Sequence, residues 1–245
     1  MAAPAYASAS AGARNGAWSS DPEGGAVSIT YQASIASGDL LLVQFQCRAA
    51  DTPATPSGYT SLYADATGTG TIEFKQTIFG KIAAGTESGT TLDILASGVP
   101  TVDDASGRIY RITGNANPAT FLDLFESAAV LSGNDASIEA PSVTTTGAEE
   151  LAVAFVCVSD DNAVASFTGE TNGDWTEAVA EYSNATGDDF CLQLQTATLN
   201  TAVALSGGSQ TMALADPWVV RAFAIKSTVG GAAATHPGWA GAGWW

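Results

Sequence analysis

An internal repeat at an offset of 110 residues is the strongest constraint on the fold of this chain. The segment LLVQFQC at residues 41–47 aligns with LAVAFVC at residues 151–157. The same offset aligns Ile109–Arg111 with Val219–Arg221. This period is longer than the roughly 20–50 residues of solenoid repeats. We therefore expect two similar halves, in one large sandwich or two packed ones, and favour one because such folds commonly reach roughly 200–250 residues.

Alternating side chains predict β-strands in both halves. Val43, Phe45 and Cys47 fall on one side of a segment whose other side carries Gln44 and Gln46, the pattern of a strand with one face toward a core. Clusters of Gly, Pro, Asn, Asp and Ser separate such segments, as turns do. The sequence therefore predicts an all-β, antiparallel β-sandwich built from two repeated halves. The clearest expected strands are Leu40–Arg48, Thr71–Ala84, Gly107–Thr113, Leu151–Ser159, Phe190–Thr198 and Trp218–Lys226.

The repeat and the composition divide the chain into a body and a tail. The body is expected at residues 1–227, with one half at about 26–114 and the other at about 136–227. Residues 10–25 are small, polar and Gly-rich, which predicts a loop. Residues 228–245 begin with a Gly/Ala-rich stretch, which is typical of a flexible linker.

The charge balance argues against two classes of partner. Of 245 residues, 25 are acidic and 8 are basic, so the net charge is −17. Recognition of nucleic-acid phosphates needs a basic face, and so does docking on anionic lipid. We therefore expect neither nucleic acid nor a membrane as partner. No apolar run reaches the roughly 18 residues of a membrane-spanning helix, and the N-terminus predicts no secretory signal.

Cysteine and histidine usage predicts neither a zinc site nor a disulfide scaffold. Cys47 and Cys157 fall at equivalent positions of the repeat, where we expect buried, inert thiols. Cys157 and Cys191 are the candidate cross-strand pair, and the sequence leaves the disulfide state of all three cysteines open. His236 stands alone in the tail, too isolated for a zinc site. No resident cofactor is expected.

The acidic residues suggest two kinds of chemistry, both of them weakly. Asp51, Asp160 and Asp161 are candidate Ca²⁺ ligands, since Ca²⁺ binds carboxylate oxygens and Asp51 aligns with Asp161. Asp also favours turns without any ligand, so we expect no metal. Paired carboxylates can hydrolyse glycosidic bonds, but an acidic chain always offers some pair, and we expect no enzyme. The carboxylates considered are Glu126, Glu139, Glu170, Asp174 and Glu177.

Aromatic residues in expected loops form a candidate glycan-binding platform. Tyr59, Tyr63, Trp175 and Tyr182 occupy such positions. Aromatic faces with a few polar groups are a common way to bind sugars. The competing interpretation is that these rings pack into the core or its rim.

The C-terminal tail carries the sharpest functional signal. Trp239, Trp244 and Trp245 lie within seven residues, spaced by Gly and Ala, and follow a turn at Pro237. Such a segment cannot bury its own apolar area, and Trp is enriched at binding hot spots. We therefore interpret the tail as an anchor for a partner or a neighbouring copy. The alternative is that it folds back on its own sandwich.

Several motifs in order resemble a known structural domain. They are Gly38-Asp39-Leu40-Leu41, then Pro56-Ser57-Gly58-Tyr59-Thr60, then Lys81-Ile82-Ala83-Ala84-Gly85, and finally Ala140-Pro141-Ser142-Val143-Thr144-Thr145 at the start of the second half. Together they resemble a widespread β-sandwich domain of tailed-phage and prophage structural proteins. The resemblance covers residues 3–227, with Tyr59 standing where the family often has Trp.

The resemblance implies a jelly-roll-like sandwich on the outer surface of a virion. The leading expectation is a non-enzymatic head decoration or cement protein, attached through its termini to the major capsid protein or to sister copies. A receptor- or glycan-binding module of a tail fibre is the alternative, and a secreted carbohydrate-active enzyme is a third. The resemblance does not decide between head and tail, because related domains occur in both.

Overall fold

The computed structural model contains strands in both halves of the chain and confirms the all-β expectation. It describes residues 3–15, 26–48, 52–63, 66–67, 74–94, 96–97, 105–115, 121–159, 164–182 and 190–227. Within these residues, the strands form two large antiparallel sheets and three two-stranded pairs. A short 3-10 helix, η1 (Phe121–Leu124), leads into the second large sheet.

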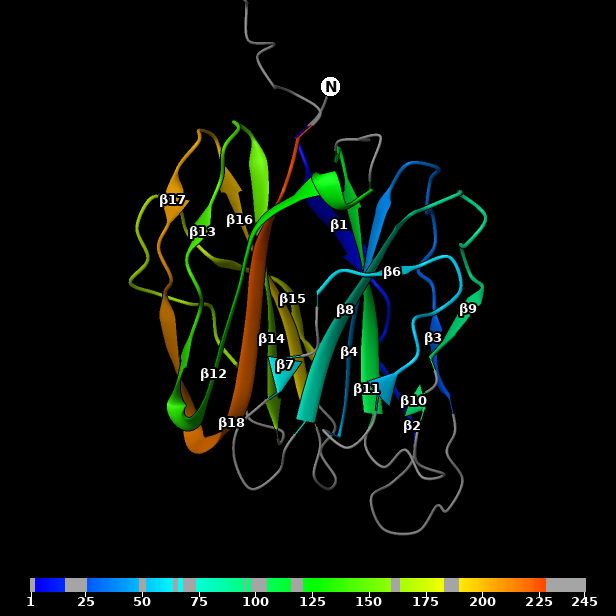
Figure 1. Cartoon of the computed structure of the whole chain (residues 1–245), viewed down its shortest axis with the longest axis horizontal. Coiled ribbons are helices and arrows are strands. Elements are labelled where there is room, and N and C mark those ends of the chain that lie inside the picture. Colours follow the sequence, from blue (N-terminus) through cyan, green and yellow to red (C-terminus); the bar gives the residue numbers. More distant parts are fainter. Residues whose placement is uncertain are drawn as a thin grey trace, which may run out of the picture.

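The first half of the chain builds one large sheet (Figure 1). Its strands lie in the order β1-β11-β4-β8-β6, with β2 beside β11 and β7 beside β8. The bounds are β1 (Ala5–Ala9), β2 (Ala13–Asn15), β4 (Leu40–Arg48), β6 (Thr60–Ser61), β7 (Ala66–Thr67), β8 (Phe74–Ile82) and β11 (Ala105–Thr113).

The second half builds the other large sheet, in the order β12-β18-β14-β16-β15. The bounds are β12 (Phe125–Glu139), β14 (Glu150–Ser159), β15 (Thr176–Tyr182), β16 (Phe190–Leu199) and β18 (Ser209–Ile225). Three further pairs are β3 (Val27–Thr30) with β9 (Thr91–Ile94), β13 (Val143–Thr144) with β17 (Ala204–Leu205), and β5 (Thr52–Pro53) with β10 (Ala96–Ser97).

The two halves share one topology, as the sequence repeat predicts. Strand β4 lies between β11 and β8, and its counterpart β14 lies between β18 and β16. The flanking strands β1 and β12 take the same edge in their sheets, next to β11 and β18. Each half adds a two-stranded pair, β3–β9 in the first and β13–β17 in the second. Two similar antiparallel halves are therefore confirmed.

The two large sheets pack face to face, and the pairs β3–β9 and β13–β17 lie on opposite outer sides (Figure 1). In the central core, Tyr110 meets Phe155 with ring centroids 5.6 Å apart. Side chains therefore fill three layers between four layers of backbone. The outer cores hold Val27, Ile29, Val43 and Phe45 in the first half, and Val143, Ala154, Val156 and Leu205 in the second.

The structural repeat is one residue longer at the central strands than the sequence alignment predicts. Before β4, the backbone N–H of Ala36 donates to Asp39 Oδ2 over 2.7 Å. Before β14, the backbone N–H of Gly147 donates to Glu150 in the same way. Asp39 and Glu150 are thus equivalent, 111 residues apart. Since side chains alternate along a strand, a shift of one residue moves each of them to the opposite face.

This shift corrects the expected equivalence of two cysteines. Cys47 faces the outer core of the first half, whereas Cys157 faces the space between the two large sheets. Both are buried, as expected. Cys191 also faces an outer core, so it lies on the opposite face of its sheet from Cys157. All three thiols are free, so the candidate pair of Cys157 and Cys191 forms no disulfide.

The polar sides of the alternating strands are buried too, which the alternation alone does not predict. Gln44 and Gln76 are fully buried on the central face of the first sheet. Gln44 Nε2 donates to the carbonyl of Val156 over 2.7 Å, and Gln76 Nε2 donates to that of Phe155 over 3.1 Å. Tyr110 Oη donates to Gln44 Oε1 over 2.8 Å. The amide nitrogens of Gln44 and Gln76 therefore link the two halves by hydrogen bonds, which offsets part of the free-energy cost of burying these side chains.

Candidate functional site

The two ends of the described chain lie together at one end of the sandwich (Figure 1). Ala5 in β1 pairs with Thr113 at the end of β11. Two residues further on, Asn115 forms a bridge with Ser227, which follows β18. A partner that holds both termini would therefore contact one end of the body and leave the other end exposed.

An apolar groove lies beside the point where β18 ends. Its volume is about 300 Å³, and its walls come from Leu62 and Tyr63, from Leu122 of η1, and from the first residues of β12, including Phe125 and Glu126. Tyr63 and Phe125 both pack on the buried ring of Phe223, with centroid distances of 5.2 and 5.4 Å. The groove therefore has a rigid aromatic base.

Glu126, which lines this groove, forms a pair with the buried Glu150. Glu126 Oε1 accepts the backbone N–H of Thr146 over 2.6 Å, and its Oε2 accepts the Thr146 hydroxyl over 2.8 Å. Its carboxyl group also shares a hydrogen bond with the buried carboxyl of Glu150. Lys226 Nζ lies 3.8 Å from Glu126 Oε2. Three strands, β12, β14 and β18, thus meet at one small polar cluster.

The pKa values of the two glutamates of this cluster are shifted in opposite directions. Burial, together with the hydrogen bond and negative charge of Glu126, raises the pKa of Glu150 to about 8. Burial alone would raise the pKa of Glu126 as well, but hydrogen bonds from Glu150 and Thr146 and the charge of Lys226 lower it below its usual range. The pair therefore holds one proton at neutral pH, with Glu150 as the donor and Glu126 as the acceptor.

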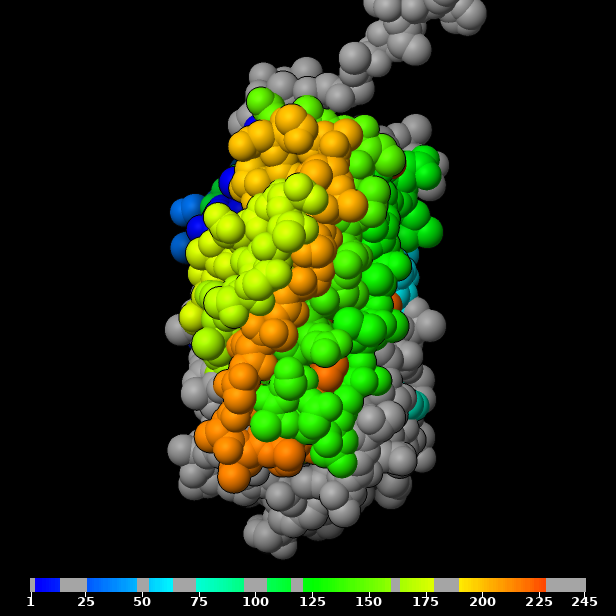
Figure 2. Space-filling model, turned by 90° about the vertical axis from the view of Figure 1, so that its left-hand side faces the viewer, coloured from blue at the N-terminus to red at the C-terminus, as the bar shows by residue number. Residues whose placement is uncertain are grey.

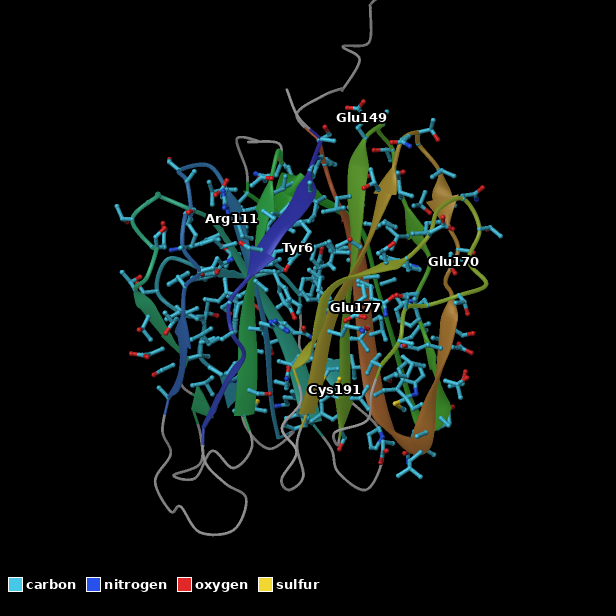
Figure 3. The ribbon with its side chains drawn as sticks, turned by 180° about the vertical axis from the view of Figure 1, so that it is seen from behind. Tyr6, Arg111, Glu149, Glu170, Glu177 and Cys191 are labelled. Carbon is cyan, nitrogen blue, oxygen red and sulfur yellow. The ribbon has the colours of Figure 1, made fainter. Side chains whose placement is uncertain are left out.

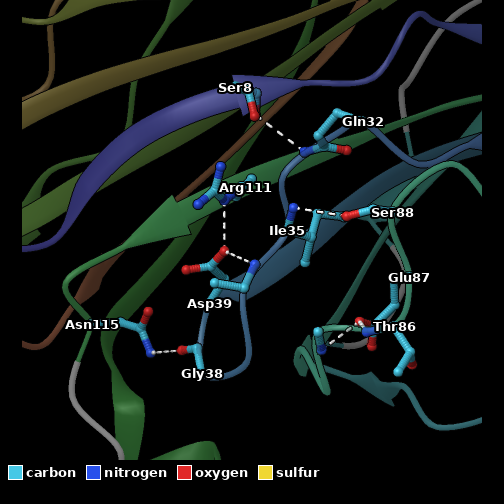
Figure 4. A network of polar contacts seen from close by, with 12 residues as sticks. Ser8, Gln32, Ile35, Gly38, Asp39, Thr86, Glu87, Ser88, Arg111 and Asn115 are labelled. Atoms are coloured by element: carbon cyan, nitrogen blue, oxygen red, sulfur yellow. Dashed lines mark hydrogen bonds and ion pairs between the residues drawn. The ribbon is translucent and has the colours of Figure 1, made fainter.

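The equivalent acid of the first half has a different partner (Figure 4). Arg111 Nε lies 2.6 Å from Asp39 Oδ2, in an ion pair that is mostly buried. Gly38, just before it, has a φ of +94°, a conformation that glycine adopts without strain. The Gly-Asp-Leu-Leu motif therefore starts strand β4 by a fixed turn and a buried charge pair.

The other two motifs of the first half meet in a second cluster. Lys81 Nζ lies 2.9 Å from Glu87 Oε1 and 5.0 Å from the ring centroid of Tyr59. Burial alone would raise the pKa of Glu87, but backbone N–H donors, Ala84 first among them, and Lys81 lower it to about 2. Tyr31 and Tyr59 share a hydrogen bond of 2.9 Å between their hydroxyl groups. These motif residues therefore build turns and packing contacts.

The candidate glycan-binding aromatics do not form a platform. Tyr59 and Trp175 are buried, with 8% and 3% of their surfaces exposed, so neither offers a ring face to a ligand. Tyr63 is half-buried in the wall of the apolar groove. The side chain of Tyr182 lies outside the described residues. Burial thus favours the packing interpretation for Tyr59 and Trp175.

The carboxylates considered for hydrolysis lie on different elements (Figure 3). Glu170 Oε1 accepts the backbone N–H of Trp175 over 3.0 Å, in the segment before β15, and Glu177 lies on β15 itself. Glu139 lines a depression with Thr168. Only Glu126 has a second carboxyl group as a hydrogen-bond partner in the described parts of the chain, and that partner, Glu150, was not a candidate.

The remaining candidates lie outside the described residues. They are Asp51, Asp160, Asp161, Pro237 and the tail tryptophans Trp239, Trp244 and Trp245. Among the residues that the structure describes, no group of three or more His, Cys, Asp or Glu side chains could hold a metal ion.

A polar groove lies at the start of β15. Its volume is about 660 Å³, and it is lined by hydroxyl, amide and carboxylate side chains. Asn172 is fixed there by its own side chain, whose Nδ2 donates to the carbonyl of Ala204 over 2.7 Å. Such a lining offers many hydrogen bonds and little apolar contact. The residues are Asn172, Gly173, Asp174, Thr176, Thr196, Ala197, Thr198, Asn200 and Thr201.

Comparison with known proteins identifies no relative. No protein family, no curated protein and no solved structure matches the chain. In the described part of the chain, no helix is long and apolar enough to cross a membrane. The interpretation of function therefore depends on the sequence motifs and on the geometry given above.

Proposed function

We propose that this chain is a non-enzymatic structural protein of a phage virion. In this proposal, residues 1–227 form a jelly-roll-like body that decorates or cements the head from outside. Residues 228–245 are the anchor, and Trp239, Trp244 and Trp245 supply its affinity. The major capsid protein or sister copies of the chain are the partners.

The arrangement of the termini is the observation that carries this proposal. Both ends of the described chain leave the same end of a rigid, four-layered body, where Asn115 bridges Ser227. An attachment made through the termini then presents the far end of the sandwich outward. The motif residues support the same interpretation, since Asp39, Lys81 and Tyr59 all have structural roles.

Purified virions provide the test. Particles from a host strain that carries the gene should contain the full-length protein on their surface, measured by mass spectrometry and immunogold labelling. A variant with Trp239, Trp244 and Trp245 all changed to Ser should be lost from the particles while its circular dichroism stays that of the parent. Full occupancy by this variant would refute the anchor, and absence of the parent protein from virions would refute the virion role.

The polar groove supports a second candidate function, a glycan-binding module of a tail fibre. Hydroxyl, amide and carboxylate groups, here including Asn172, Asp174 and Thr196, form the directional hydrogen bonds by which proteins orient polyhydroxylated ligands. A glycan array tests this function directly. Binding that is lost in Asp174→Ala but kept in Asp216→Ala, which lies outside the groove, would support it, and a blank array would exclude the groove as a sugar site.

A further inference from the structure

The apolar groove of Leu62, Tyr63, Leu122 and Phe125 lies beside several exposed apolar side chains. Leu122, Val130 and Leu131 are 50%, 44% and 38% exposed, and all lie on η1 or on the first part of β12. Of these three, Leu122 lines the groove itself, and a large exposed apolar side chain in a groove is typical of a contact surface.

The edge position of β12 leaves this surface open. Strand β12 pairs with β18 on one side and is the last strand of its sheet on the other. In Figure 2, β12 in green and β18 in orange run side by side across the outer face of the second half. Leu214 of β18 is also exposed, at 64%, but it does not line the groove.

The C-terminal segment of the same chain begins beside this groove. Lys226 N donates to the carbonyl of Leu124 over 3.0 Å, and Lys226 Nζ lies 3.8 Å from Glu126, which lines the groove. A Gly/Ala-rich chain from Ser227 to Trp239 has a mean end-to-end distance of about 20 Å. A tether of this length would present the tail tryptophans to the groove at an effective concentration on the order of millimolar.

We propose that the groove is the docking site of the chain's own C-terminal segment, residues 239–245, before assembly. The indole rings of this segment would cover Leu122 and stack against Tyr63 and Phe125, which hold a rigid aromatic base for them. At micromolar protein, the tethered segment outcompetes that of another copy because its effective concentration is higher. One part of this inference rests on the proposed anchoring role, namely the later release of the tail from the groove to a partner. The docking itself does not depend on that role.

Photo-crosslinking of the full chain tests this docking. The photoreactive residue p-benzoylphenylalanine replaces Trp244, and equal amounts of ¹⁴N- and ¹⁵N-labelled protein are mixed at low micromolar concentration before illumination. Mass spectrometry should find cross-links from position 244 to residues 62–63 and 121–128. Each cross-linked product should carry a single isotope label, because the link forms within one chain. Cross-links between labels, or cross-links spread over the whole body, would overturn the proposal.

Two exposed leucines supply matched variants. Leu122→Asp places a charge in the groove and should lower the cross-link yield roughly tenfold, as loss of a central contact does. Leu214→Asp makes the same change outside the groove and should leave the yield unchanged. Equal yields in both variants would overturn the docking site. Because these measurements use purified protein, they are independent of whether the chain is found on virions.

Discussion

The two halves of the molecule place an acidic side chain at the same point and neutralise it in different ways. In the first half, Asp39 forms an ion pair with Arg111 over 2.6 Å. In the second half, the equivalent Glu150 shares a proton with Glu126. Both acids also accept a backbone N–H from three residues earlier, Ala36 or Gly147. The turn at the start of the central strand is thus common to both halves, while the charge partner differs.

Strand pairing explains how the partners came to differ. Arg111 of β11 pairs with Leu41 of β4. The equivalent of Leu41 is Ala152 of β14, which pairs with Ala224 of β18. Ala224 therefore takes the place of Arg111 in the second half. On the next strand, Ser8 pairs with Arg111, whereas Glu126 pairs with Ala224. The first half therefore places a cation near its acid, and the second places another acid. The same backbone turn therefore accommodates a charged acid in one half and a protonated acid in the other.

Removing the cation of the first half should have the largest effect. Arg111→Ala leaves Asp39 as a buried carboxylate with one backbone donor, and we expect the free energy of unfolding to fall by about 3 kcal/mol. Urea denaturation followed by circular dichroism measures this loss. Adding Asp39→Asn to Arg111→Ala removes the uncompensated charge and should restore part of the stability. A loss of less than about 1 kcal/mol in the single variant would show that the pair behaves as an exposed one.

Neutralising the acid of the second half should have a smaller effect of opposite sign. The pKa of Glu150 is about 8 in the folded protein and 4.5 for an ordinary glutamate. Between these pH values only the folded state holds the proton, so the free energy of unfolding falls as pH rises through this window. Glu150→Gln mimics the protonated carboxyl. The full difference between these pKa values corresponds to roughly 4 kcal/mol at pH 8. Relaxation and water penetration around the charged pair reduce it, so we expect the variant to raise the free energy of unfolding by about 2 kcal/mol.

Denaturation curves at several pH values between 5 and 9 check this prediction. The parent should lose stability as pH rises to 8 and then level off, while Glu150→Gln should lose the dependence assigned to this residue. Glu126→Gln should weaken the same dependence, because it removes the charge that helps to raise the pKa of Glu150. Glu149→Gln changes the same charge one residue away and should leave the slope in place. Equal slopes in the parent and Glu150→Gln would contradict the shared proton.

The strands and the duplication could be predicted from the sequence because they depend on local patterns. The alternation around Val43 and Phe45 and the recurrence of LAVAFVC at residues 151–157 are visible without any structure. The exact equivalence was wrong by one residue at β4 and β14. It was wrong by three residues at β11 and β18, where Arg111 is equivalent to Ala224 and not to Arg221. Aligning similar letters does not detect which face a side chain takes. At the 110-residue offset Asp39 aligns with Glu149, whereas in the structure its equivalent is Glu150.

The glutamate pair and the buried glutamines could not be predicted, because both depend on packing between distant segments. Glu126 and Glu150 are 24 residues apart, near the starts of β12 and β14, two strands that both pair with β18. Gln44 has the side chain of a solvent-facing residue, but a second sheet covers it and accepts its hydrogen bond. Among the candidate sites, Tyr63 and Glu126 lie at the groove, and neither was predicted to line it.

The smallest effect concerns the residue before each acid, where the halves differ again. Gly38 and Glu149 are equivalent, with φ angles of +94° and +59°. Gly38→Ala should destabilise the protein by about 1 kcal/mol, because a side chain at positive φ is strained even where space is open around it. Glu149→Gly should relieve that strain and stabilise by about 0.5 kcal/mol after the entropy loss of glycine is subtracted. Thermal melts of the two variants should therefore shift in opposite directions, and a shift of both in the same direction would show that the two turns are not equivalent.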